Sequence, residues 1–564
     1  MAPRYAVSVS APAFDKLYNY SDLAAAVDSL VSEFPGLCEV SSIGLSYEGR
    51  EIRLLTITDQ TTGPAEEKPA FWLDANIHAT ELTGTTAALH YAWTLLSRAA
   101  AGEPRETAIV RGCTAYIVPR LNPDGAEHVL TVGTYLRSSV RPYQRLDHQR
   151  GLREYDVDGD GRILSMRIAD PNGSWRVDAD EPRLLCPRAP DDLGLDGPYY
   201  RVVMEGTIDD FDGVTFSNAT PEKGLDLNRN YPTWRPENEQ VGAGPHPLSE
   251  PEVDAVVRAM TSRQNICLFN TYHTYGGLHL RPYASKADDE MPTGDLRLYK
   301  YLGECMTKIT GYPCISVFHD FKYHPKQVES GASDDWAYEH LGIPGWTTEI
   351  WSLKREAGLT DTRYIEWFDW HDPADDRALL KYSDEALHAK GYVDWYPFEH
   401  PQLGRVELGG WDTLRSWSNP PDHLLETEIV PLTDVALFNL SLLPRLEHHS
   451  TQVRRLDGDA WAVRVVVQNT GFMSANVTEK AVERKIPGLE ISLPDDIVIV
   501  NGDRVQKLGH PGGRADARSS TLAADDTGDR AKGEWVVQAA QGASFVATAV
   551  HPRAGTVRIP VTLA

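Results

Sequence analysis

The fold of this chain is decided by residues 71–81, which read FWLDANIHATE. The run Phe71–Ala75 is typical of a buried strand, and His78 and Glu81 follow three residues apart at its end. An imidazole and a carboxylate at this spacing can face one metal ion, because a catalytic zinc ion typically takes three protein ligands and leaves one position for water. The same spacing also occurs in surface turns, so other parts of the sequence are needed to distinguish a metal site from a turn.

Strands and helices alternate on both sides of this stretch. The predicted strands are residues 38–43, 52–58, 71–75, 115–119, 266–270 and 345–350. The predicted helices follow Tyr20 and cover residues 82–96, 252–260 and 296–309. Such alternation predicts an α/β fold, with a mixed, mainly parallel sheet flanked by helices.

A chain of 564 residues is too long for one hydrophobic core, so we expect more than one domain. The α/β pattern predicts a first domain over residues 12–400, with a long insertion at about 141–223 that is either functional, as a lid or rim of the site, or decorative. Residues 401–444 are rich in Trp and Pro and are expected to form a connector. Alternating β-type runs over residues 445–564 predict an all-β, sandwich-like domain.

The formal net charge of −26 argues against nucleic acid and anionic membranes as partners, because both would be repelled. No apolar stretch predicts a membrane span, and the segment Met1–Ala11 lacks the pattern of a secretory signal. We therefore expect a cytoplasmic location as written, or a secreted one if a signal was removed. The six cysteines lack metal-binding spacing, although Cys305 and Cys314 could form a bridge. The oligomeric state is not predicted.

Further motifs follow the first one in a fixed order. They are PRLNPDG at 119–125, GLDLNRNY at 224–231, LSEPE at 248–252, YHTY at 272–275 and TTEI at 347–350. Together with residues 78–81 they resemble the zinc metallocarboxypeptidase family, of the carboxypeptidase A/B type, from about Tyr18 to Ile350. The resemblance implies a zinc-dependent enzyme that hydrolyses the C-terminal peptide bond of a peptide.

The resemblance also implies roles for the reacting groups. His78, Glu81 and His273 would hold zinc, which lowers the pKa of water to about 7. Glu349 would be the general base that takes a proton from the water and returns it to the leaving amine. Arg137 would stabilise the oxyanion, with the neighbouring Arg141 as an alternative.

The resemblance also implies which residues contact the substrate. Asn228 and Arg229 match the pair that grips a terminal carboxylate. Asp334 stands where an acidic residue selects C-terminal Lys or Arg, unless it pairs with an internal arginine or is redirected by the insertion. The remaining predicted contacts are Tyr275 and Tyr323.

Two positions depart from the family pattern. Gln327 stands at the place of the family's capping tyrosine, and Thr80 stands where many members carry an additional arginine. These departures concern the substrate more than the chemistry. An amidohydrolase of the same fold acting on N-acyl or modified amino acids, and an inactive peptide-binding protein, therefore remain as alternatives.

The insertion carries a candidate calcium loop. Asp156, Asp158 and Asp160 alternate around turn glycines, as in a loop that binds calcium. Arg167 stands where the last, bidentate acid of such a loop is expected. A solvated acidic turn is the alternative.

Overall fold

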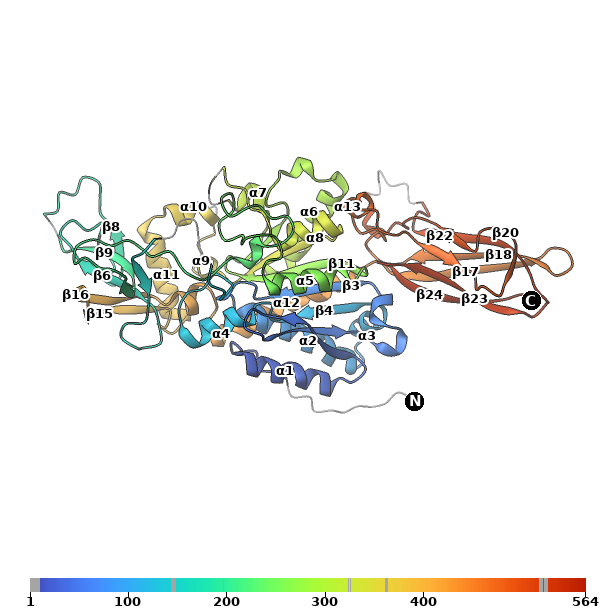
Figure 1. Cartoon of the computed structure of the whole chain (residues 1–564), viewed down its shortest axis with the longest axis horizontal. Helices are drawn as coiled ribbons and strands as arrows, with labels where there is room; N and C mark the ends of the chain where they lie inside the picture. The colour runs from blue at the N-terminus through green and yellow to red at the C-terminus, as the bar shows by residue number, and fades with distance from the viewer. Residues whose placement is uncertain are drawn as a thin grey trace.

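The computed structural model describes residues 11–143, 149–195, 197–322, 324, 326–360, 364–516, 521 and 526–564. It has an α/β body in the middle, with the insertion at one end and a β-domain at the other (Figure 1). No helix in these ranges is long and apolar enough to cross a membrane. All six cysteines are free, so Cys305 and Cys314 do not form a bridge.

The central sheet has eight strands in the order β1-β2-β4-β3-β11-β14-β12-β13. Their bounds are β1 Cys38–Leu45, β2 Glu51–Ile57, β3 Ala70–Ala75, β4 Thr114–Val118, β11 Ile266–Thr274, β12 Leu278–Arg281, β13 Cys314–Ser316 and β14 Gly345–Ile350. Strands β4, β3, β11 and β14 are parallel neighbours, whereas β1, β2 and β12 introduce antiparallel pairs. The predicted mixed α/β fold is confirmed.

Helices cover both faces of this sheet. The longer ones are α1 Tyr20–Glu33, α2 Thr83–Ala100, α3 Pro104–Gly112, α4 Pro123–Val132, α5 Pro251–Thr261, α6 Thr293–Thr310, α8 Ser333–Leu341, α11 Pro373–Ala386 and α12 Asp422–Ser441. The shorter helices of the chain are α7 Val317–Asp320, α9 Leu353–Glu356, α10 Tyr364–Asp369 and α13 Glu479–Glu483, of which α13 belongs to the C-terminal segment. Side chains alternate along β3, so Phe71 and Leu73 enter the core beneath α2, while Trp72 enters the core beneath α5.

Residues 401–444, expected as a connector, are integrated into the body. Helix α12 contributes apolar side chains such as Leu425 and Ile429 to the same core as Phe71. Its Thr433 bonds to His90 of α2 over 2.6 Å. The sequence conceals this helix because Pro431 lies inside it, and an internal proline is normally a sign that a helix ends.

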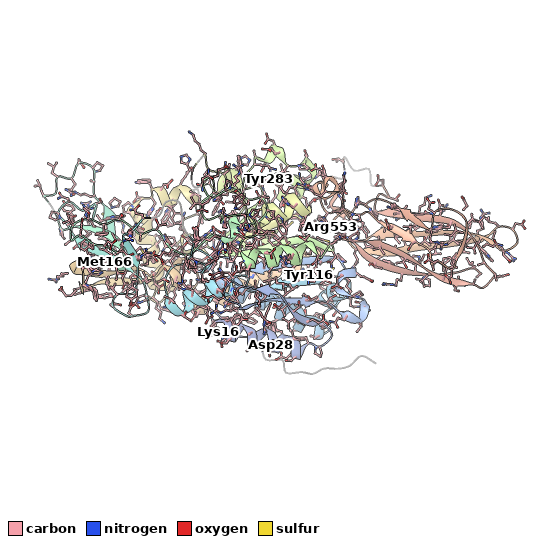
Figure 2. The ribbon with its side chains drawn as sticks, in the orientation of Figure 1. Lys16, Asp28, Tyr116, Met166, Tyr283 and Arg553 are labelled. Atoms are coloured by element: carbon pink, nitrogen blue, oxygen red, sulfur yellow. The ribbon has the colours of Figure 1, made fainter. Side chains whose placement is uncertain are left out.

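The insertion forms a sheet with a distant hairpin. Strands β6 Ser165–Ala169, β7 Trp175–Val177, β8 Leu185–Pro187 and β9 Tyr199–Met204 join β15 Tyr392–His400 and β16 Gly404–Trp411 in the order β15-β16-β6-β9-β7-β8. The short pair β5 Leu152–Glu154 and β10 Gly206–Ile208 lies beside them in the chain. We call residues 149–223 and 392–411 the insertion module. Figure 2 labels Met166 within it.

The C-terminal β-domain consists of two four-stranded sheets. One contains β17 Leu446–Arg455, β18 Ala460–Asn469, β22 Arg530–Gln538 and β20 Val498–Asn501. The other contains β21 Val505–Lys507, β19 Glu490–Ser492, β23 Ser544–His551 and β24 Gly555–Thr562. Trp461, Trp535 and Ile559 belong to the core that the two sheets share. The all-β, sandwich-like fold is confirmed.

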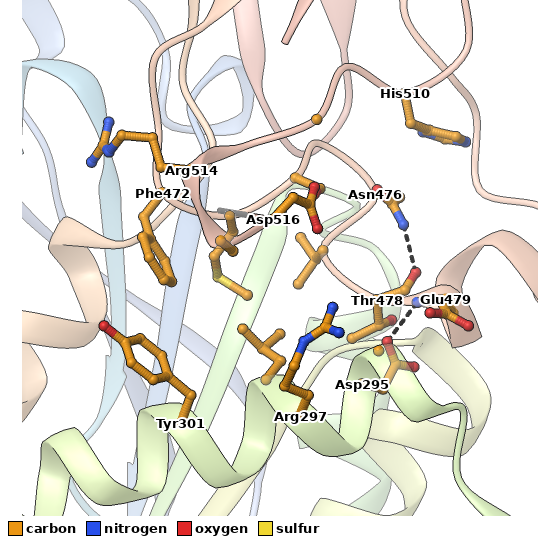
Figure 3. A pocket seen from close by; sticks show the side chains of 17 residues that line it. Asp295, Arg297, Tyr301, Phe472, Asn476, Thr478, Glu479, His510, Arg514 and Asp516 are labelled. Atoms are coloured by element: carbon orange, nitrogen blue, oxygen red, sulfur yellow. Dashed lines mark hydrogen bonds between the residues drawn. The ribbon is translucent and has the colours of Figure 1, made fainter. Parts of the chain in front are cut away.

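The β-domain is docked firmly on the α/β body. Asp295 of α6 accepts hydrogen bonds from the backbone nitrogens of Glu479 and Lys480, over 2.7 and 3.1 Å. A cavity of about 600 Å³ lies beside this contact, where Tyr301 stacks on Phe472 (Figure 3). The junction therefore combines polar anchors with aromatic packing.

Arg553 is a further buried anchor of this junction and gives a first prediction. Its guanidinium donates to the carbonyls of Leu341, Gly342 and Asn476, and the residue, labelled in Figure 2, is only 4% exposed. Arg553→Ala should lower the free energy of unfolding by about 3 kcal/mol, because three carbonyl acceptors, one of them fully and two partly buried, lose their donor. Chemical unfolding followed by tryptophan fluorescence measures this.

The control is Arg558→Ala at the same junction. Arg558 pairs with Glu67 over 2.8 Å, but its side chain is 57% exposed, so the loss should stay below about 1 kcal/mol. Equal effects of the two substitutions would contradict the assignment of Arg553 as the anchor.

Candidate active site

The three predicted zinc ligands meet at one edge of the central sheet. His78 and Glu81 follow β3, and His273 lies near the end of the parallel neighbour β11. The Nδ1 atom of His78 is 2.7 Å from Oε1 of Glu81 and 3.1 Å from Nδ1 of His273. Nδ1 of His273 is 3.1 Å from the other carboxylate oxygen of Glu81. All three residues are buried.

The donor set fits a zinc ion. Nε2 of His78 lies 3.2 Å from Oδ1 of Asp226, and an imidazole that donates there presents a lone pair at Nδ1. That lone pair faces a carboxylate oxygen and a second imidazole nitrogen, which repel it unless a cation lies between them. Within the described chain, Oε2 of Glu81 is buried without a hydrogen bond of good geometry. Two imidazoles and one carboxylate are a common catalytic zinc set.

Glu349 stands beside this group. It lies in β14 directly opposite His273 of β11, so the two side chains occupy adjacent places at the same edge of the sheet. Burial raises the pKa of Glu349 to about 8; His273 and Arg137 oppose this shift, and the charge of Glu81 adds to it. A carboxyl group whose affinity for a proton is raised by its surroundings is suited to proton transfer.

The structure separates the two candidate arginines. Arg137 lines the cavity, with its Nε atom 2.9 Å from Oδ2 of Asp226 and its Nη1 atom 3.9 Å from Oε1 of Glu81. Arg141 instead pairs with the buried Glu250. We call His78, Glu81 and His273 the metal group. Arg137 is therefore the arginine that faces the metal group.

Asp226 is a site residue that the sequence analysis did not single out. It bonds both His78 and Arg137 and also caps the short helix Leu227–Arg229. Burial alone would raise its pKa, but Arg137, His78 and Arg229 hold the pKa of Asp226 well below its usual value. The sequence feature that could have identified Asp226 is its position within the motif at 224–231.

The predicted carboxylate anchor lies on the same short helix. Oδ1 of Asn228 accepts from the backbone nitrogen of Ser333 over 2.9 Å. Arg229 donates from Nη1 to the carbonyl of Asn228 over 2.8 Å, and its Nη2 atom lies 2.7 Å from Oε2 of Glu329. Both residues line the cavity, as does Glu329.

Asp334 lies in the first turn of α8 and also lines the cavity. Its Oδ2 atom accepts from Oγ1 of Thr347 over 3.3 Å, and burial raises the pKa of Asp334. Over the part of the chain that is described, no Lys or Arg pairs with it. The surrounding wall is apolar, with Leu280, Val317 and Ile365 as examples.

Aromatic side chains close another side of the cavity. The aromatic wall consists of Tyr275, Tyr364, Trp367, Phe368, Trp411 and Trp417. The ring of Tyr275 lies 6.3 Å from that of Phe368 and 6.0 Å from that of Trp417. Most of these residues come from 364–417, beyond the motifs, so no local signal identified them. The predicted contact Tyr323 lies outside the described residues, and Gln327 is exposed.

The whole arrangement surrounds a cavity of about 760 Å³. Ser165 and Met204 of the insertion module border it, so the module forms part of its rim. The cavity brings together the predicted residues His78, Glu81, Arg137, Asn228, Arg229, His273, Tyr275, Asp334 and Glu349.

The candidate calcium loop lies away from this cavity. The carboxylates of Asp156, Asp158 and Asp160 come within 4.8 Å of one another. Asp156 accepts backbone hydrogen bonds from Gly159 and Gly161, and Asp158 accepts from the hydroxyl group of Tyr396. The carboxylates are thus already engaged by the protein, and calcium gains no support from the structure.

The fold is a mixed α/β sheet flanked by helices, and the site holds a candidate His-Glu-His metal group. A family model described as zinc carboxypeptidase matches residues 23–181 and 202–367, more than half of the chain. The chain therefore belongs to the zinc carboxypeptidase family, whose members use zinc. A second model, described as a domain of unknown function, matches residues 445–562.

Individual relatives are distant. The chain is 24% identical to carboxypeptidase B of Astacus astacus over 338 residues, covering 59% of this chain and 86% of that protein. It is 25% identical to carboxypeptidase A2 of Rattus norvegicus over 340 residues, covering 58% and 61%. The crystal structure of thrombin activatable fibrinolysis inhibitor matches with a TM-score of 0.44 at 16% identity, covering 77% of this chain and 76% of that one.

Proposed function

We propose that this protein is a zinc-dependent metallocarboxypeptidase that hydrolyses the C-terminal peptide bond of peptides. The observation that carries the proposal is the meeting of His78, Glu81 and His273 with Glu349 in one cavity, in a chain of the zinc carboxypeptidase family. Arg137 and Arg229 add positive charge to the same cavity. The geometry supports hydrolysis by an activated water molecule without a covalent intermediate.

When bound by these three residues, zinc supplies a positive charge that polarises water and the substrate carbonyl. Glu349 accepts the proton of the attacking water and returns it to the leaving nitrogen. Asp226 holds the Nε2 atom of His78 and the Nε atom of Arg137, so it fixes a zinc ligand and the arginine together. Arg137 is then directed at the negative charge that develops on the carbonyl oxygen.

The leaving residue would lie between Arg229 and Asp334. Arg229, supported by Asn228, would bind the terminal carboxylate. Asp334 has apolar walls around it, and over the described chain it has no internal cation. A C-terminal Lys or Arg, with its aliphatic stem and charged end, fits this pocket best.

The side-chain preference gives a second prediction. Asp334→Asn should lower kcat/KM for a blocked dipeptide ending in Arg by about 100-fold, because a desolvated charge pair is worth several kcal/mol. The value for the matching substrate ending in Phe should change little. Steady-state kinetics with the two substrates measure the ratio.

Asp335→Asn is the control, since Asp335 is equally buried in the same helix turn but accepts from the backbone of Ala284 instead of lining the cavity. An unchanged Arg-to-Phe ratio in Asp334→Asn would remove the basic preference and leave the reaction type untouched.

The proposed function is tested with blocked dipeptides ending in Arg, Phe or Glu, assayed with and without zinc chelation. Release of the terminal amino acid that stops on chelation is the expected result. No release from any of the three would contradict the proposal.

An amidohydrolase acting on N-acyl or modified amino acids is the second candidate. It is favoured by the exposed Gln327 at the place of the capping tyrosine and by the pairing of Arg229 with Glu329. N-acyl amino acids assayed beside the dipeptides distinguish the two. An inactive peptide-binding protein would bind these compounds without cleaving any of them.

A further inference from the structure

Arg229 forms an ion pair inside the cavity. Its Nη2 atom lies 2.7 Å from Oε2 of Glu329, and the two side chains are only 12% and 15% exposed. Charged hydrogen bonds of this length are among the stronger ones in proteins, and limited access to water reduces their screening. The guanidinium that would bind a substrate carboxylate therefore already holds a carboxylate of the protein.

The backbone keeps Glu329 in this place. The segment that follows it is bonded to the segment of Arg229: Tyr231 donates to the carbonyl of Gly331 over 3.1 Å, and Gly331 donates to the carbonyl of Thr233 over 3.2 Å. Gly331 has a φ of +72°, and a Cβ atom there would lie 2.1 Å from the carbonyl oxygen of Arg229. Only glycine permits this close approach.

The ion pair makes a second carboxylate at Arg229 costly. Arg137, which also lines the cavity, is already engaged with Asp226. A carboxylate that reaches Arg229 has to share it with Glu329 or displace it, and two carboxylates at one guanidinium repel each other.

We propose that Glu329 is a specificity-determining residue that competes, within the molecule, with the terminal carboxylate of the substrate for Arg229. The inference rests on the proposed function. Glu329 weakens the binding of peptides with a free terminal carboxylate. It therefore reduces the difference in affinity between these peptides and peptides with a neutral C-terminal end. A purely structural ion pair predicts the opposite, because loss of Glu329 would then misplace Arg229 and weaken carboxylate binding.

The experiment compares two ligands by calorimetry in the Glu349→Gln background, which prevents turnover. The ligands are a blocked dipeptide ending in Arg and its C-terminal amide. Adding Glu329→Gln should tighten binding of the free acid by on the order of tenfold, which corresponds to about 1.4 kcal/mol, and leave the amide within about twofold. Unchanged or weaker binding of the acid would overturn the inference.

Two further variants distinguish a failure of the inference about Glu329 from a failure of Arg229 as the carboxylate anchor. Glu339→Gln is the matched control, because Glu339 forms a similar partly buried pair with Lys286 over 2.7 Å outside the cavity, and it should change neither affinity. Arg229→Gln should weaken the acid selectively. If it does so while Glu329→Gln has no effect, only the inference fails. If neither ligand binds, or Arg229→Gln has no effect, the proposed anchor fails as well.

Kinetics of the otherwise unaltered protein give an independent reading. Glu329→Gln should lower KM for the free acid by a similar factor with little change in kcat, since Glu329 acts on binding and not on the reacting atoms. A fall in kcat with unchanged KM would contradict a competitor role. Thermal melts of each variant check that the fold is retained.

Discussion

We expect Glu349→Gln to lower kcat for peptide hydrolysis by about a thousandfold or more and to leave bound zinc in place. The amide has nearly the same size as the carboxylate but cannot accept the proton of the attacking water. Glu349 is not among the three groups that converge on the metal position, so its replacement leaves the ligand set intact. Rates with a blocked dipeptide and metal content by plasma mass spectrometry measure both effects.

Glu356→Gln is the matched control. Glu356 pairs with Arg355 over 2.6 Å just beyond the same strand and does not line the cavity, so activity should be preserved. Retained activity in Glu349→Gln would contradict the assignment of Glu349 as the general base. Loss of zinc from that variant would show that Glu349 supports the metal group instead.

We expect His273→Ala to remove zinc and activity together. The three candidate ligands lie within 4.8 Å of one another, and loss of one leaves too few donors for tight binding. A bound metal also stabilises the folded state, by about 4 kcal/mol at a thousandfold excess over its Kd. We therefore expect a chelator to lower the Tm of the unaltered protein and to have no effect on the Tm of His273→Ala.

His279→Gln serves as the control for this substitution. His279 is equally buried in the same sheet but bonds to Thr348 and Thr310, over 3.1 and 3.0 Å, away from the cavity. It should retain zinc and activity. If His273→Ala still binds zinc at full stoichiometry, the ligand set proposed here is wrong.

Part of the site could be predicted because its residues follow buried strands. His78 and His273 are recognisable at or near the ends of apolar runs, and the ends of neighbouring parallel strands meet at one sheet edge. The choice between Arg137 and Arg141 could not be made in this way. The two lie four residues apart in one irregular segment. Arg141 is excluded from the site by its ion pair with Glu250, which lies 109 residues further along the chain.

Other site residues had no local signal at all. Glu329 is defined by its contact with Arg229, which lies 100 residues earlier. The aromatic wall draws Trp411 and Trp417 from a segment that reads as a connector. Trp411 is placed by β16, which pairs with β15 and with β6 of the insertion, a strand about 240 residues earlier.

The sequence by itself determined the α/β class, the all-β C-terminal domain and the candidate metal group, because strand and helix periodicity and short motifs are local properties of the chain. Only the tertiary structure decided which arginine faces the metal group, what occupies Arg229 and what forms the rim of the cavity. The rim depends on pairs such as Arg167 with Glu407, 240 residues apart, which join the insertion to β16. Such pairs form because folding brings distant backbone and charge into contact, and nothing in the local pattern encodes them.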